Sequence, residues 1–82
     1  MDKEATFALI ARLLTELFAI EPEKISLEAD LYRDLDIDSI DAVDLAIEFK
    51  KQTGRQLSPD EFKQIRTVGD IVEAFQASPR EN

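Results

Sequence analysis

Residues 34–49 read DLDIDSIDAVDLAIEF. Within this stretch the spacing of apolar residues changes from irregular to helical, and this change decides the fold. From Glu23 to Asp38 the apolar residues are spaced irregularly and mixed with acids, which predicts a loop. Beyond Asp38, four residues recur at the spacing of one helical face: Ala42, Leu45, Ala46 and Phe49. Asp38 or Ser39 can cap this helix, and Gly54 provides its stop. The stretch therefore predicts a long loop that leads directly into a helix.

The chain on either side predicts three more helices. The first covers about residues 3–18, and Glu21-Pro22 ends it because the residue before a proline is pushed out of the helical region. Ser58-Pro59-Asp60-Glu61 has the form of a capping box with proline at the first helical position, and starts a short helix. Thr67-Val68-Gly69-Asp70 repeats the starting signal for a fourth helix.

These elements indicate an all-α fold. We expect a four-helix bundle of three long helices and one short one, with a long first loop. A chain of 82 residues suffices for one domain, which we place at residues 1–78, followed by a frayed tail over 79–82. The predicted core residues are Phe7, Ile10, Leu14, Leu17, Leu31, Leu45, Phe49, Phe62, Ile65, Val68, Ile71 and Phe75.

Composition narrows the class of function. The 18 acidic and 10 basic residues give a net charge of -8, whereas nucleic-acid and anionic-membrane binders need clustered Lys and Arg. The absence of Cys and His removes thiol nucleophiles, thiolate metal sites and the commonest general base. The N-terminus does not have the pattern of a secretory signal, and no apolar run reaches the roughly 20 residues of a membrane span. We therefore expect a cytoplasmic protein that binds partners.

The predicted second helix has a second apolar face, roughly opposite its core face. It consists of an apolar strip with flanking acids: Ile40, Val43 and Ile47, beside Asp41, Asp44 and Glu48. Neighbouring elements could bury both faces, or the strip could be exposed as a docking surface. Between Glu28 and Glu48 eight acids oppose Arg33 alone, so this segment carries a charge of -7. That concentration favours docking to a partner with a basic surface.

The run Asp38-Ser39-Ile40 resembles the Asp-Ser-Leu motif that acyl carrier proteins place at the start of their second helix. The similarity continues through residues 42–45 and includes the helix start at residues 67–71, so it covers essentially the whole domain. The resemblance implies that the all-α fold is a four-helix acyl-carrier-like bundle. It also implies a specialised stand-alone type II carrier, a monomer without catalytic activity of its own. Its acyl chain would lie between the second and third helices.

The resemblance also implies a site. Ser39 would carry 4'-phosphopantetheine, transferred from coenzyme A by a phosphopantetheinyl transferase, with Asp38 beside it. The arm would hold acyl groups as thioesters for enzymes of fatty-acid or polyketide type, such as ketosynthases and acyltransferases. Those partners would bind the strip and acids defined above. Residue chemistry agrees, because a chain without cysteine needs a thiol from a prosthetic group, and a helix N-terminus tolerates a phosphate.

Some residues depart from the family's common pattern. Asp36 stands where glycine is usual, and Ile40 where leucine is usual. Lys50 and Lys51 occupy positions that are commonly acidic in fatty-acid carriers, and Lys63 and Arg66 make the third helix more basic. Since lysines weaken docking to basic partners, we favour a specialised pathway of polyketide or aryl-polyene type.

Two alternatives remain at this point. The first is an EF-hand, because acids at Asp34, Asp36 and Asp38 match loop positions 1, 3 and 5. Three later positions fail to match: Ser39 replaces the turn glycine, Asp41 replaces an apolar residue and Leu45 replaces the bidentate glutamate. The second is an acidic helical adaptor that binds a basic partner and is never modified. Covalent modification is the one observation that distinguishes this adaptor from a carrier.

Overall fold

The computed structural model describes residues 2–57 and 59–77 of the chain. In chain order the elements are α1 (Lys3–Phe18), the 3-10 turn η1 (Pro22–Lys24), α2 (Ser39–Thr53), α3 (Pro59–Lys63) and α4 (Val68–Ala77). The all-α prediction is confirmed, and one isolated bridge joins Asp30 to Thr67. The predicted cap at Ser58, the side chain of Phe62 and the tail over 79–82 lie outside what the structure describes.

Local signals account for the ends of the long helices. Gly54 ends α2 with φ of 75°, and its N–H donates to the carbonyl oxygen of Lys50 at 2.8 Å. The predicted start of α4 is confirmed by reciprocal bonds between Thr67 and Asp70, each 3.1 Å long. In α1 the helix ends before the proline, because Ala19 adopts a left-handed conformation with φ of 56°. Its N–H donates to two carbonyl oxygens of the last turn.

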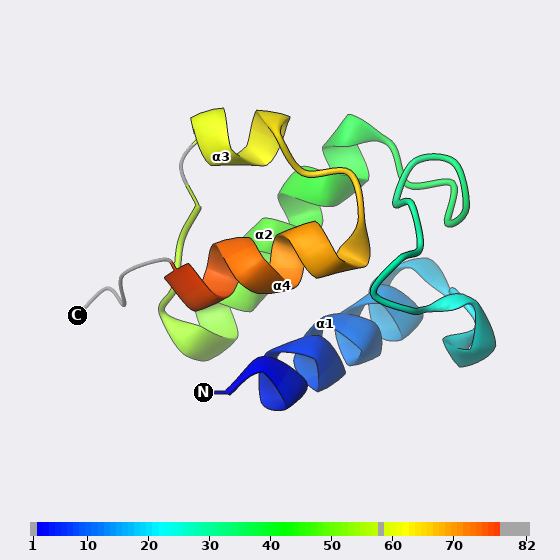
Figure 1. Ribbon diagram of the computed structural model, residues 1–82, viewed down its shortest axis with the longest axis horizontal. Helices are drawn as coiled ribbons and strands as arrows, with labels where there is room; N and C mark the ends of the chain where they lie inside the picture. The colour runs from blue at the N-terminus through cyan, green and yellow to red at the C-terminus, as the bar shows by residue number, and fades with distance from the viewer. Residues whose placement is uncertain (1, 58, 78–82) are drawn as a thin grey trace.

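The core forms where α1 packs against both α2 and α4 (Figure 1). At its centre the rings of Phe49 and Phe75 stack with centroids 3.8 Å apart. The structure buries most of the predicted core residues, and Phe7 packs against them partly buried. Leu17 was predicted wrongly, since its side chain is 41% exposed in the last turn of α1. Ile20, just beyond the helix, is buried instead.

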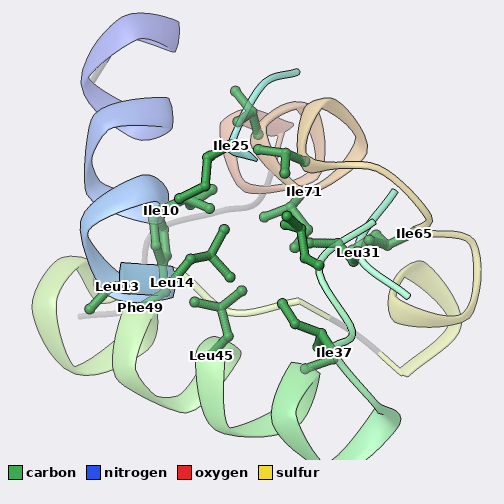
Figure 2. Close-up of a cluster of buried hydrophobic side chains, with 14 of the residues drawn as sticks. Ile10, Leu13, Leu14, Ile25, Leu31, Ile37, Leu45, Phe49, Ile65 and Ile71 are labelled. Atoms are coloured by element: carbon green, nitrogen blue, oxygen red, sulfur yellow. The ribbon is translucent and has the colours of Figure 1, made fainter. Parts of the chain in front are cut away.

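The long loop between α1 and α2 contributes its own side chains to the core. Figure 2 shows Ile25, Leu31 and Ile37 pointing toward side chains from the helices. Most of the loop's apolar residues are therefore part of the core, whereas Leu27 is 38% exposed. The loop contains little regular secondary structure, because its apolar residues are too irregularly spaced to share one helical face.

Three backbone bonds tie the loop to the start of α4, alongside which it runs in Figure 1. The N–H groups of Leu31, Val68 and Gly69 donate across this junction at 2.8, 3.0 and 2.9 Å. Gly69 allows the approach, because a Cβ there would lie 3.0 Å from the carbonyl oxygen of Leu27. The junction holds the loop against the core and thereby positions the start of α2.

Candidate functional site

The site begins with the cap of α2. Asp38 is the N-cap residue, and its Oδ1 accepts the N–H of Asp41 at 2.9 Å. The Asp41 carboxylate accepts the N–H of Asp38 in return, at 3.4 Å, which completes a capping box. Asp38 therefore caps the helix, and the exposed Ser39 is its first residue. The interpretation of Ser39 as a plain N-cap is wrong.

The loop before the cap is organised by aspartates that bond to the backbone. Asp30 Oδ1 accepts the N–H groups of Tyr32 and Arg33, both at 2.9 Å. The bond from the Arg33 N–H is the main reason that the pKa of Asp30 lies below its ordinary value. Asp34 Oδ2 accepts the N–H of Asp30 at 2.8 Å. Asp34 therefore serves the loop backbone, and the described residues contain no group of three acids placed to hold a metal ion.

The apolar strip on α2 is exposed. Ile40 is 72% exposed, Val43 51% and Ile47 49%, whereas Leu45 and Phe49 on the core face are buried. Of the flanking acids, Asp44 is exposed, and Asp41 and Glu48 are half-buried. The hypothesis that neighbours bury both faces is therefore wrong. Solvent-facing apolar side chains beside carboxylates form a surface suited to a partner that is apolar at its centre and basic at its rim.

A groove with a volume of about 530 Å³ starts at the same serine. On α2 the lining residues recur about once per helical turn. The other lining residues come from the loop before α2, the link to α3 and the end of α3. The lining residues are Tyr32, Ser39, Ala42, Val43, Ala46, Ile47, Lys50, Gln56, Leu57 and Lys63. Ala46 therefore lines the predicted space between the second and third helices. Leu45 and Ile65 are buried in the core.

Sequence reasoning missed the polar part of this groove. Lys50 could have been found, because it continues the helical spacing from Ser39 through Ala46. Tyr32, Gln56 and Lys63 gave no such signal, since they reach the groove from other segments of the chain.

The sequence is similar to those of known proteins. The family model described as "Phosphopantetheine attachment site" matches residues 8–75. The chain belongs to the acyl carrier protein family. Its similarity to "Acyl carrier protein 2" of Ralstonia nicotianae is 52% identity over 68 residues, covering 83% of this chain and 84% of that protein.

Further relatives of the acyl carrier family cover more of the chain. The acyl carrier protein of Coprothermobacter proteolyticus is 35% identical over 78 residues, which is 95% of each chain. The acyl carrier protein of Thermotoga maritima has a similar solved structure, with a TM-score of 0.79 at 24% identity, covering 93% of this chain and 88% of that one. That structural likeness supports the fold.

Membership in the acyl carrier family fits the residues present. The prosthetic group of the family's attachment domain is 4'-phosphopantetheine. The structure offers an exposed serine at a helix start and an adjoining groove with apolar walls, which suit a phosphate ester and an acyl chain. The family works with a phosphopantetheinyl transferase and with biosynthetic enzymes. No helix within residues 2–57 and 59–77 has the length and hydrophobicity that a bilayer crossing needs.

Proposed function

We propose that Ser39 carries the 4'-phosphopantetheine arm, and that this chain transports acyl groups between biosynthetic enzymes without catalysing a reaction itself. One observation carries the proposal: the exposed first residue of α2 is also a wall residue of the groove. A group attached to Ser39 is therefore accessible to an enzyme and adjoins a space that can shelter it. We take residues 1–78 as the carrier domain.

The chemistry required of Ser39 is simple. Its Oγ forms a bond to phosphorus as the phosphoanhydride bond of coenzyme A breaks, and adenosine 3',5'-bisphosphate leaves. The hydroxyl proton passes to a base on the transferase. When bound, the prosthetic group supplies the thiol that this cysteine-free chain lacks. The partial positive charge at the start of α2 favours the resulting phosphodiester. Asp38 holds that first turn in place through the cap.

The partner surface in this proposal is the exposed strip with its acids. Ile40, Val43 and Ile47 provide the apolar contact, and Asp41, Asp44 and Glu48 provide attraction to basic rims. The partners are the transferase and acyl-processing enzymes such as ketosynthases and acyltransferases, and the chain meets each of them as a monomer. Because much of the attraction is electrostatic, binding weakens as salt increases.

The cargo in this proposal is an acyl group of fatty-acid or polyketide type. Among the relatives, a Mycobacterium tuberculosis protein is named "Meromycolate extension acyl carrier protein"; it is 35% identical over 82 residues, covering all of this chain and 71% of that protein. Lys50 and Lys51 add positive charge to the second helix, which weakens docking to enzymes with strongly basic surfaces. The two lysines therefore favour partner enzymes of a specialised pathway.

Intact mass spectrometry tests the attachment. The chain is incubated with coenzyme A, magnesium and a broad-specificity phosphopantetheinyl transferase, in parallel with Ser39→Ala. The variant keeps the Asp38 cap and should fold normally. We expect the parent to gain one phosphopantetheine and the variant none. No gain by the folded parent, while a known carrier is modified in the same assay, would instead favour the unmodified adaptor.

A further inference from the structure

A second hollow, next to the groove, is lined mainly by basic side chains. It has a volume of about 400 Å³ and is formed by the loop before α2, the end of α3 and the link to α4. Its lining residues are Asp30, Tyr32, Arg33, Lys63, Ile65 and Arg66. Three of these are cations and one is an acid, whereas the whole chain has 18 acids and 10 bases. The hollow is therefore opposite in charge to the protein as a whole.

Backbone contacts hold the two sides of the hollow together. The N–H of Leu31 donates to the carbonyl oxygen of Arg66 at 2.8 Å, and the isolated bridge joins Asp30 to Thr67. Arg33 comes from the loop and Arg66 from the link before α4, yet both side chains line the same hollow. The cations are thus brought together by the fold, through bonds that do not depend on their side chains.

The acid of the hollow has close hydrogen-bond partners, but the cations have none. Asp30 Oδ1 accepts two backbone N–H groups, both at 2.9 Å. The N–H of Arg33, and to a lesser extent the guanidinium charges of Arg33 and Arg66, lower the pKa of Asp30. Within the part of the chain that the structure describes, the exposed side chains of Arg33, Lys63 and Arg66 form no salt bridge and no hydrogen bond. These cations are therefore available to the carboxylates of another molecule.

Tyr32 adds an aromatic contact at the same place. It is 38% exposed and lines both the hollow and the groove, as Lys63 does. Arg and Tyr are enriched in protein interfaces, because the guanidinium fork matches carboxylates and the phenol ring buries a large area. The groove also contains Val43 and Ile47 of the exposed strip on α2. The hollow is thus continuous with the proposed docking surface, and a partner that covers the strip faces the hollow as well.

We infer that the hollow binds carboxylates on the surface of a partner enzyme, with Arg33 and Arg66 as the main contacts and Lys63 in support. The inference rests on the proposed function and specifies its partner. An enzyme that docks on α2 presents basic residues to Asp44 and Glu48, and acidic residues to the hollow. The hollow repels an enzyme whose docking surface is basic throughout, so it selects among possible partners.

The test uses short charged peptides as probes of the two surfaces. The full chain, isotopically labelled, is titrated with hexaglutamate and followed by NMR. The salt concentration is about 0.1 M, where a Debye length of about 10 Å screens distant acids but preserves contacts inside the hollow. We expect saturable shifts of the side-chain Nε–H signals of Arg33 and Arg66 and of the backbone amides of residues 63–66. Hexalysine should instead shift the amides of Asp44 and Glu48.

Paired charge variants locate the binding. Arg33→Gln/Arg66→Gln removes both guanidinium groups, and it should fold because the hydrogen bonds at these positions come from the backbone. Followed by the amides of residues 63–66, its binding of hexaglutamate should be roughly three- to tenfold weaker, as expected for the loss of two exposed ion pairs. Arg12→Gln/Lys51→Gln is the matched control, because it changes the net charge equally at positions outside the hollow. Its affinity should stay within about twofold of the parent.

Three results would overturn the inference. The first is the absence of shifts at the hollow with hexaglutamate, and the second is equal weakening by the two double variants, since binding would then follow overall charge. The third is a stronger response of the same signals to adenosine 3',5'-bisphosphate, which would assign the hollow to the phosphates of coenzyme A. Because the titration needs no group on Ser39, each of these results leaves the carrier function intact. A chain that gains no mass in the loading assay would overturn the proposed function whatever the peptides do.

Discussion

Replacing Asp38 by alanine tests whether the cap of α2 positions the site. Asp38 Oδ1 accepts the N–H of Asp41 at 2.9 Å, and loss of such a cap costs about 0.5–2 kcal/mol. The return bond from the Asp38 N–H is long, at 3.4 Å, and contributes little more. We therefore expect Asp38→Ala to lose about 1 kcal/mol of unfolding free energy. In a domain of this size, that loss lowers the melting temperature by about 4–8 °C.

The assay follows thermal unfolding by circular dichroism and the rate of loading at Ser39 by mass. Asp2→Ala is the matched control, because Asp2 caps α1 through the N–H of Ala5 at 2.8 Å. That cap lies near the N-terminus, away from the start of α2 (Figure 1). Asp2→Ala should lose comparable stability without slowing the loading of Ser39. Asp38→Asn keeps an acceptor oxygen and should melt close to the parent.

Two outcomes would refute this reasoning. If Asp38→Ala melts within about one degree of the parent, the cap does not stabilise α2 in solution. If Asp2→Ala slows loading as much as Asp38→Ala does, the loss reflects general stability and not the local order beside Ser39. Slow loading by a fully stable Asp38→Asn would assign the effect to the charge of Asp38.

Three further predictions concern stability and docking. Ala19→Gly should raise the unfolding free energy by about 0.5–1 kcal/mol in urea denaturation, because glycine adopts the left-handed conformation at φ of 56° without steric cost; an unchanged or lower value contradicts this. Asp44→Lys should reduce the kcat/KM of partner enzymes several-fold at low salt, whereas Glu4→Lys on α1 should not; equal effects would exclude docking through α2. The N–H groups of Thr67 and Arg66 hold the pKa of Asp70 below its ordinary value, so its contribution to stability is complete above the unfolded pKa and disappears as pH falls through the folded one. Asp70→Asn should therefore flatten the decline in melting temperature below about pH 4, and an unaltered profile would contradict the assignment.

Sequence patterns predicted the helices well because helix starts and stops are local. Caps and stop residues bond to neighbours within a few positions, as Asp38 does with Asp41 and Gly54 with Lys50. The end of α1 was predicted at residue 18 from Glu21-Pro22, but the residue that ends the helix is Ala19, whose left-handed conformation carries no signature in its side chain. Asp36 also adopts positive φ, at 55°, which explains why glycine suits that position.

Burial depended on which segments the fold brings together. The sequence alone showed that α2 has two apolar faces, but only the packing of α1 and α4 decided that Phe49 is buried and Ile40 exposed. Leu17 continues the helical pattern of the core yet is 41% exposed, since no periodicity within one helix specifies how far its partners extend.

The sequence by itself determined the helical fold class, the start of α2 and the serine at that start, because short-range hydrogen bonds and periodicity set all three. Tertiary structure alone decided which side chains share the groove. Lys50 and Lys51 are neighbours with the same charge, but only Lys50 lines the groove, because one residue of helix turns the side chain by about 100°. Gln56 and Leu57, from the link between α2 and α3, line the same groove, which no pattern within α2 could predict.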